Sequence, residues 1–304
     1  MNNSKYNKGF IEKYIEPVRK IASNMPQTVS IEVTTRCQLD CTYCTRDKNN
    51  PKDLTLENLD RLLEHLKGIK KIVICGMGES FCFPNLYEAI FKLKSFKISI
   101  ITNGAVPINY DKLNREGNVE LLVFSIDATT EEKMESICRS YNFKVLENNI
   151  TNLRKYPNII GIINTTINES NIDEIPKLVE LAWKYNLQAV NYELPIGDEE
   201  FVLKNKSLIR KRIRQAAESA KKYNIIFNNF YRLNCNANGS IIPNIRINGD
   251  MFSCCNGMNQ NKKIGNIYEK YFDDIWRDRA VSLLHSQDFC LECKLTKNLM
   301  SIVE

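Results

Sequence analysis

The chain has 304 residues, of which 43% are hydrophobic, enough for one large domain and a small one. Its net charge of +6 is modest and dispersed, so the composition does not indicate a partner that is nucleic acid. No apolar run approaches the ~18 residues of a membrane span, and the first residues lack a signal-peptide stretch. We therefore expect a cytoplasmic protein without membrane contact, whose eleven cysteines indicate metal ligation rather than disulfides.

Strands and helices are predicted to alternate along most of the chain. Six β-branched or apolar runs indicate strands, at residues 28–35, 71–75, 97–102, 119–125, 159–166 and 188–194. Helical periodicity is found at about 9–23, 55–66, 85–93, 130–154 and 173–185. Thr55 is the expected N-cap of the second of these helices. Strands spaced by helices imply βαβ units in a parallel sheet with right-handed crossovers.

The fold class predicted from this order is α/β, with a partial barrel of six βα units. The barrel is expected over 28–197, after an N-terminal helical extension over 1–27. A helical linker over 198–224 then leads to a small hairpin-and-helix domain over 225–304. Ligands of parallel sheets bind at the carboxyl ends of the strands, so the loop after the first strand lies at the expected site.

That loop contains three cysteines, Cys37, Cys41 and Cys44, with the spacing C-x3-C-x2-C. A cubane 4Fe–4S cluster usually takes four thiolates. Three local thiolates would leave one iron open to a small ligand. A zinc knuckle or a two-electron redox pair is the alternative interpretation of these cysteines.

The spacing resembles the signature of the radical S-adenosylmethionine (SAM) enzymes, in which SAM chelates the open iron and is cleaved to a 5′-deoxyadenosyl radical. Residues 76–80 resemble the family's G-G-E-P motif, with departures at Met77 and Ser80. Residues 102–104 are similar to its T-N-G motif, and residues 125–128 resemble S-I-D-G. The resemblance implies a set of SAM contacts: Tyr43, Gly76, Gly78, Glu79, Asn103, Ser125, Asp127, Arg139, Asn164 and Glu193. Taken singly, each could equally be a cap, a turn or a surface polar group.

A second set of cysteines follows near the end of the chain. Cys235 and Cys254 are separated by 18 residues, and Cys290 and Cys293 form a C-x2-C pair. Asn248-Gly249, shortly before Cys254, is a strong hairpin signal. Four thiolates would close a metal site. The pattern resembles the auxiliary-cluster domain called SPASM, in its shortened twitch form, and implies a second 4Fe–4S cluster; structural zinc is the alternative.

The remaining cysteines are interpreted one by one. Cys75 is expected to be buried as a small hydrophobe, Cys138 to pack in the core, and Cys82 to lie near the site as a weak catalytic candidate. Neighbouring strand residues point to opposite faces, so Cys255 is expected to face away from the ligand Cys254, toward the barrel mouth. Radical SAM peptide epimerases carry a similar pair, whose second thiol gives a hydrogen atom to the substrate. Cys255 is thus the candidate hydrogen donor.

The resemblance implies an enzyme that cleaves SAM and abstracts hydrogen from a substrate carbon. We expect epimerisation of a small polar substrate, such as a sugar, aminoglycoside or cyclitol, with Cys255 as the donor. A dehydrogenase that oxidises a hydroxyl through the auxiliary cluster is one alternative, and an enzyme modifying a short ribosomal peptide is another. A non-enzymatic iron–sulfur electron carrier is the alternative of a different class. The implied protein partner is an electron donor of the flavodoxin or ferredoxin type.

Overall fold

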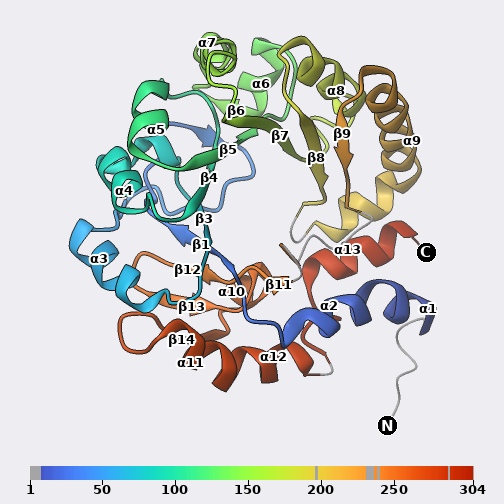
Figure 1. Ribbon diagram of the computed structural model, residues 1–304. Helices are drawn as coiled ribbons and strands as arrows, with labels where there is room; N and C mark the ends of the chain where they lie inside the picture. Colours follow the sequence, from blue (N-terminus) through green and yellow to red (C-terminus); the bar gives the residue numbers. More distant parts are fainter. Residues whose placement is uncertain (1–7, 196–197, 231–235, 238–239, 287, 304) are drawn as a thin grey trace.

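The computed structural model describes residues 8–195, 198–230, 236–237, 240–286 and 288–303. Its main feature is one ten-stranded sheet that curves into a partial barrel, with helices around the outside (Figure 1). The six predicted strands are confirmed and run parallel: β1 (Thr28–Glu32), β3 (Lys71–Cys75), β4 (Lys97–Thr102), β5 (Val119–Ser125), β7 (Ile160–Thr166) and β8 (Ala189–Glu193). The predicted α/β class and partial barrel are therefore confirmed.

The helices follow the predicted order. The N-terminal helical segment consists of α1 (Lys8–Phe10), η1 (Ile11–Ile15) and α2 (Glu16–Ala22). The barrel helices are α3 (Leu56–His65), α4 (Leu86–Lys92), α5 (Tyr110–Glu116), α6 (Glu131–Ile137), α7 (Phe143–Leu153), α8 (Ile175–Lys184) and α9 (Glu199–Tyr223). Thr55 caps α3 as expected, because its hydroxyl accepts the N–H of Asn58 at 3.1 Å. None of the helices in the described ranges is long and apolar enough to cross a membrane.

Two features of the barrel differ from the prediction. The stretch predicted as helical over 130–154 is interrupted by β6 (Cys138–Arg139), which pairs antiparallel with β2 (Asp40–Cys41) in the cysteine loop. The helix predicted as a linker, α9, leads into a further parallel strand, β9 (Ile226–Asn228), beside β8. Helix α9 is thus also the crossover of another βαβ unit.

The C-terminal region extends the barrel sheet directly. Strand β12 (Asn244–Ile245) pairs parallel with β1, and β13 (Asp250–Phe252) and β14 (Lys263–Asn266) continue antiparallel. The predicted turn is present, since Gly249 has φ +82° and Arg246 N–H donates to Asp250 at 2.9 Å. The other elements are η2 (Ser80–Cys82), β10 (Asn236–Ala237), β11 (Ser240–Ile241), α10 (Cys255–Asn259), α11 (Phe272–Ile275), η3 (Trp276–Ala280), α12 (Val281–His285) and α13 (Lys294–Val303).

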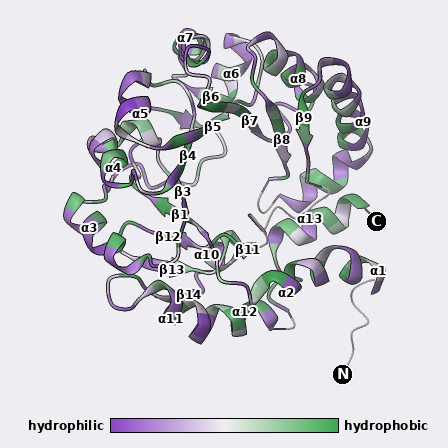
Figure 2. Ribbon diagram, in the orientation of Figure 1, coloured by the Kyte–Doolittle hydropathy of each residue, from purple (hydrophilic) through white to green (hydrophobic). Residues whose placement is uncertain are grey.

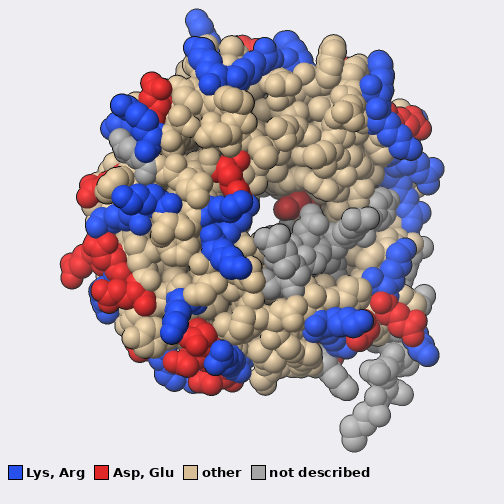
Figure 3. Space-filling model, viewed as in Figure 1, with Lys and Arg blue, Asp and Glu red and all other residues tan. Residues whose placement is uncertain are grey.

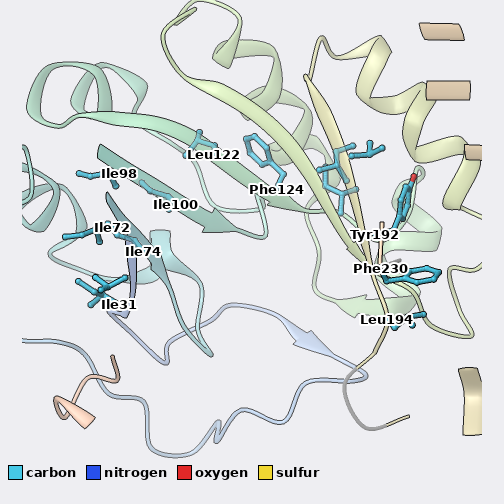
Figure 4. Packing of buried hydrophobic residues seen from close by; sticks show 14 of the residues in the cluster. Ile31, Ile72, Ile74, Ile98, Ile100, Leu122, Phe124, Tyr192, Leu194 and Phe230 are labelled. Carbon is cyan, nitrogen blue, oxygen red and sulfur yellow. The ribbon is translucent and has the colours of Figure 1, made fainter. Parts of the chain in front are cut away.

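The core lies between the sheet and its helices. Alternate strand residues point outward and are fully buried, and parallel pairing places them side by side, as with Ile74 between Ile31 and Ile100. Figure 4 shows this layer continuing through Leu122 and Phe124. Hydropathy alternates along the helices as well (Figure 2), as expected for elements with one buried face. The opposite face of each strand is left to line the inside of the barrel.

Candidate active site

Polar side chains occupy the inner wall of the barrel. Ser125, Asn164, Asn191 and Asn228 are register partners on β5, β7, β8 and β9, so they form one row across four strands. The amide of Asn228 donates to the side chain of Asn191 at 2.8 Å. Figure 3 shows a hollow at the centre of the ring, with acidic side chains at its edge and within it. The predicted SAM contacts Ser125 and Asn164 therefore lie together; Asn228 was not predicted, since a three-residue strand carries little sequence signal.

Two backbone hydrogen bonds hold the cysteine loop, one just before Cys37 and one between Cys41 and Cys44. At its start, Gly78 N–H donates to Thr34 O at 3.2 Å, and a Cβ on Gly78 would lie 2.4 Å from Arg36 O. Only glycine allows this approach, which gives the second glycine of the G-G-E-P-like motif a packing role. Further along, Thr42 N–H donates to Ile137 O at 3.0 Å beside the β2–β6 pair.

Each of the three sulfur atoms of this loop lies near a hydrogen-bond donor, which would stabilise a thiolate. Leu39 N–H lies 3.4 Å from Cys37 Sγ, and Arg46 N–H lies 3.5 Å from Cys44 Sγ. A side-chain hydrogen bond from Cys138 lowers the pKa of Cys41, although burial opposes it. Burial raises the pKa of Cys37 to about 11, against the effect of the Leu39 amide and Arg46.

Glu79 organises the strand ends next to this loop. Its buried carboxylate accepts Thr102 Oγ1–H at 2.6 Å, Asn103 N–H at 2.6 Å and Phe81 N–H at 3.0 Å. Burial nevertheless raises the pKa of Glu79. Because the oxygens are engaged by the protein, its carboxylate supports the Thr102-Asn103-Gly104 turn. The neighbouring Asn103 amide reaches Cys37 Sγ at 3.8 Å, so this predicted contact borders the cysteine loop.

Tyr43, Asp127 and Arg139 surround the middle of the loop. Tyr43 Oη donates to Asp127 Oδ2 at 2.5 Å, which joins the cysteine loop to the end of β5. Burial raises the pKa of Asp127 to about 6, although the Tyr43 hydroxyl opposes the shift. Arg139 is 72% exposed and lies 3.8 Å from Asp40, its register partner on β2. All three thus lie around the cysteines.

The second set of cysteines also comes together. Cys254, Cys290 and Cys293 line one small cavity with Val18, Phe289 and other side chains. Burial raises the pKa of Cys290 to about 12, and the nearby Cys254 and Cys293 add to the shift. Cys235, the predicted fourth ligand, lies outside the described residues. Three thiols around one cavity are a donor set that fits a cluster or a zinc ion.

Cys255 does not lie on a strand, which corrects the prediction. Strand β13 ends at Phe252, and Cys254 is the N-cap of α10, accepting the N–H of Gly257 at 3.5 Å. Cys255 therefore begins a helix, and the two thiols diverge because a cap and the first helical residue point differently. Its thiol lies 3.9 Å from the Asn244 amide and is exposed to solvent. Partial removal of its sulfur from water raises the pKa of Cys255 to about 12, and the nearby Cys254, Cys75 and Glu193 add to the shift.

Two further cysteines lie near the site. Cys75 was expected to be buried in the core, but it is half-buried on the inner wall, 2.8 Å from Ser30 Oγ. Successive strand residues point to opposite faces, and Ile72 and Ile74 face outward, so the inward position of Cys75 could have been predicted from the sequence. Cys82 Sγ lies 3.4 Å from the Gln38 side chain, beside the cysteine loop.

Within the described ranges, no three Cys, His, Asp or Glu side chains are gathered closely enough to hold a metal ion as they stand. The donor sets nevertheless fit iron–sulfur ligation, because the first consists of three thiols within one short loop and the second of three thiols that the fold brings to one cavity. A sequence model of the radical SAM superfamily matches residues 31–182, and one of the SPASM iron–sulfur cluster-binding domain matches residues 235–294. The chain belongs to the radical SAM superfamily.

Similar proteins agree with this assignment. GTP 3',8-cyclase of Chlorobaculum tepidum is 28% identical over 202 residues, which cover 63% of this chain and 61% of that protein. The enzyme of the same name from Brucella ovis is 28% identical over 185 residues, covering 56% and 54%. The chain thus spans little more than half of these relatives. SuiB of Streptococcus suis, solved with S-adenosylmethionine, superposes with a TM-score of 0.68 over 94% of this chain and 75% of that chain, at 18% identity.

As a radical SAM enzyme with a SPASM domain, the protein uses a SAM-binding 4Fe–4S cluster, an auxiliary 4Fe–4S cluster and SAM. Cys37, Cys41 and Cys44 stay the predicted ligands of the first cluster, and the predicted ligands Cys254, Cys290 and Cys293 of the second line one cavity. The limits of the domains, the shortened twitch form and the individual SAM contacts stay predictions.

Proposed function

We propose that the protein is a radical SAM epimerase in which the Cys255 thiol returns hydrogen to a small polar substrate. One observation carries the proposal: Cys255 directly follows Cys254, a predicted ligand of the auxiliary cluster, yet Cys255 is exposed and its thiol lies 3.9 Å from the Asn244 amide on β12, the strand beside β1. A packing cysteine would be expected in the core.

The contacts of Cys255 with residues next to the inner wall of the barrel support this proposal. Its neighbour Asn244 is the register partner of Ser30, and Ser30 in turn bonds Cys75. Glu193, at the end of β8, is close enough to influence the Cys255 thiol electrostatically. The thiol is thus within reach of a molecule that lies between these strands.

When bound, the cluster and SAM supply hydrogen-atom abstraction from an unactivated carbon. The work of the chain is to hold the substrate, exclude water and deliver the second hydrogen. In the delivery step the S–H bond of Cys255 breaks and a C–H bond forms on the opposite face of the substrate carbon. The sulfur is left as a thiyl radical, which one electron from the auxiliary iron–sulfur cluster, itself reduced again by the external electron donor, and one proton from water would restore to the thiol.

The inner wall favours a small polar substrate. The row of Ser125, Asn164, Asn191 and Asn228 offers hydroxyl and amide groups, which both donate and accept hydrogen bonds. A sugar, an aminoglycoside or a cyclitol presents complementary hydroxyls and amines. Such groups would fix the orientation of the carbon relative to Cys255.

The test is anaerobic turnover in deuterated water with candidate substrates of these classes. Solvent deuterium at an inverted carbon supports thiol-mediated return, since a thiol exchanges its hydrogen with water. Cys255→Ala should still form 5′-deoxyadenosine but lose the inverted product. Cys75→Ala is the matched control, because it removes another inner-wall thiol and should keep the product. Full inversion with full deuterium in Cys255→Ala would reject the donor role and make Cys82 the next residue to test.

A modified peptide is the second candidate substrate. SuiB bound to its precursor peptide SuiA superposes with a TM-score of 0.68 over 98% of this chain and 78% of that chain, at 17% identity. The deuterium experiment applies to a peptide as well, read out by mass spectrometry. Dehydrogenation would instead give a ketone or aldehyde without solvent deuterium, and a cyclase activity like that named for the relatives would not require Cys255.

A further inference from the structure

Helix α9 carries an unusual concentration of positive charge on the outside of the barrel. Between residues 204 and 214 there are six cations and no carboxylate: Lys204, Lys206, Arg210, Lys211, Arg212 and Arg214. This equals the net charge of +6 of the whole chain, so the rest of the molecule is neutral on balance. Figure 3 shows basic side chains along the edge where Figure 1 places α9. The excess positive charge is therefore concentrated on this helix, which corrects the expectation that the net charge is dispersed.

Apart from Arg212, these cations lie within one half of the circumference of α9, outside the stripe of buried residues. Lys206, Arg210 and Arg214 are spaced by four residues and share a face, while the apolar Ile209 and Ile213 are buried against the barrel. Of the six, Arg212 pairs with Asp173 at 2.7 Å. In the part of the chain that the structure describes, the others have no ion pair within 4.0 Å. Like charges on one helix face repel each other, so an anionic partner would stabilise this face.

The position of α9 connects this face to the auxiliary cysteines. Helix α9 packs against α13, which begins at Lys294, directly after Cys293. Asn298 of α13 donates to the carbonyl of Pro195, just ahead of α9, so the first half of α9 lies along α13. Lys294 is exposed and adds a further cation at the start of α13. Helix α9 is thus joined through α13 to the segment that contains Cys290 and Cys293.

We propose that this α9 face, made by Lys204, Lys206, Arg210, Lys211 and Arg214, is the docking surface for a small, acidic one-electron carrier protein. A hollow of about 420 Å³ on this face is lined by Arg210, Lys211 and Arg214 and by one acid, Glu218, so cations outnumber carboxylates around it. Polar, charge-guided surfaces suit brief electron-transfer contacts, which bury little area, better than they suit permanent assembly. The carrier gives up one electron and is oxidised; the enzyme's iron–sulfur centres accept it, and no atom is transferred. Each SAM cleavage consumes such an electron, whatever becomes of the substrate.

The test compares two sources of electrons in the reconstituted full-length enzyme. The variant Lys204→Glu/Lys211→Glu/Arg214→Glu reverses three exposed charges of the α9 face. The control Lys67→Glu/Lys144→Glu/Lys155→Glu reverses three exposed lysines elsewhere and changes the net charge equally. Formation of 5′-deoxyadenosine is measured with an acidic, photoreduced flavodoxin and, separately, with dithionite, which needs no docking surface.

With flavodoxin at low salt, the α9 variant should lose about tenfold or more in rate, and its rate should no longer fall as salt rises. With dithionite, all three proteins should react equally, which shows that the variant is folded and loaded. Equal flavodoxin rates in variant and control would overturn the proposal, as would an equal loss with dithionite. Binding of a tRNA mixture that the variant abolishes, without a change in the flavodoxin rate, would assign the face to nucleic acid instead. Because SAM cleavage is the readout, the result does not depend on epimerisation.

Discussion

Cys41 and Cys138 lie directly opposite each other on the antiparallel strands β2 and β6, with their side chains in hydrogen-bond contact. Cys41 is one of the three cysteines of the SAM-binding loop, whereas Cys138 lies outside the signature. Opposed residues of antiparallel strands have Cα atoms about 4.5–5.5 Å apart, which is within the range of about 4.4–6.8 Å for a disulfide. The structure therefore places Cys41, a predicted cluster ligand, next to a thiol that can oxidise with it.

We predict that air oxidation of the cluster-free protein joins Cys41 to Cys138, with oxygen taking up the two hydrogens. The disulfide removes a ligand, so iron and sulfide should rebuild the first cluster only after a thiol reductant is added. Differential alkylation and peptide mass spectrometry detect the bond directly. Cys138→Ala should regain iron without the reductant; if the wild type does so equally well, the prediction is wrong.

The three hydrogen bonds to Glu79 are predicted to stabilise the fold. In Glu79→Gln, one carboxylate oxygen becomes an NH₂ that faces the backbone N–H of Asn103 or of Phe81, so at least one of these two hydrogen bonds is lost. We expect the free energy of unfolding to fall by about 1–3 kcal/mol in chemical denaturation. Glu120→Gln is the control, because Glu120 bridges Lys71 and Lys97 at the surface; it should cost less than about 1 kcal/mol. Equal effects of the two changes would refute the role given to Glu79.

The sequence was sufficient for the parallel sheet, because runs such as Lys71–Cys75 are apolar and bounded by turn residues and do not depend on distant partners. It also indicated the loop of Cys37, Cys41 and Cys44, whose spacing is local, whereas Cys254 meets Cys290 and Cys293 only through the fold. Strands of two or three residues, such as β6 and β12, exist only because a distant strand pairs with them. Their own residues carry no periodic pattern, so the contact of Cys138 with Cys41 was not predictable.

The prediction that Cys255 lies on a strand was wrong for a related reason. The hairpin signal at Asn248-Gly249 predicted the returning strand, but not the residue at which that strand ends. Cys254 caps a helix through its own sulfur, an unusual capping group that the sequence preferences do not indicate. The divergence of the two thiols was anticipated, although by a different geometry.

Gly78 should be intolerant of a side chain. In Gly78→Ala the new Cβ would lie 2.4 Å from Arg36 O and 2.7 Å from Thr34 O, so the backbone that leads into Cys37 must move. We expect lower iron content of the first cluster and a lower melting temperature. Gly68→Ala is a matched control, because Gly68 has φ +85° but nothing within 4 Å of the added carbon. It should cost about 1–2 kcal/mol through strain and leave iron unchanged.

The metal inventory tests both donor sets together. Two cubane clusters imply about eight irons per chain after anaerobic reconstitution. Replacing Cys37, Cys41 and Cys44 by Ala should remove about half of the iron and all SAM cleavage, while Cys290→Ala/Cys293→Ala should affect the other half. Inductively coupled plasma mass spectrometry measures iron and zinc in parallel. Only four irons together with one zinc in the intact protein would disprove the second cluster.

Arg139 is predicted to bind the carboxylate of SAM. It is largely exposed, and its distance of 3.8 Å to Asp40 is too long for a good hydrogen bond, so its guanidinium is available beside the cysteine loop. Loss of a charge-assisted hydrogen bond costs about 1.5–3 kcal/mol, so Arg139→Ala should weaken SAM binding by about ten- to a hundredfold. Equilibrium dialysis with the reconstituted enzyme measures the Kd. Lys48→Ala is the control, because Lys48 is the other cation that contacts Asp40 and has no predicted role in SAM binding. If both variants bind SAM like the wild type, the family's arginine role does not apply to this position.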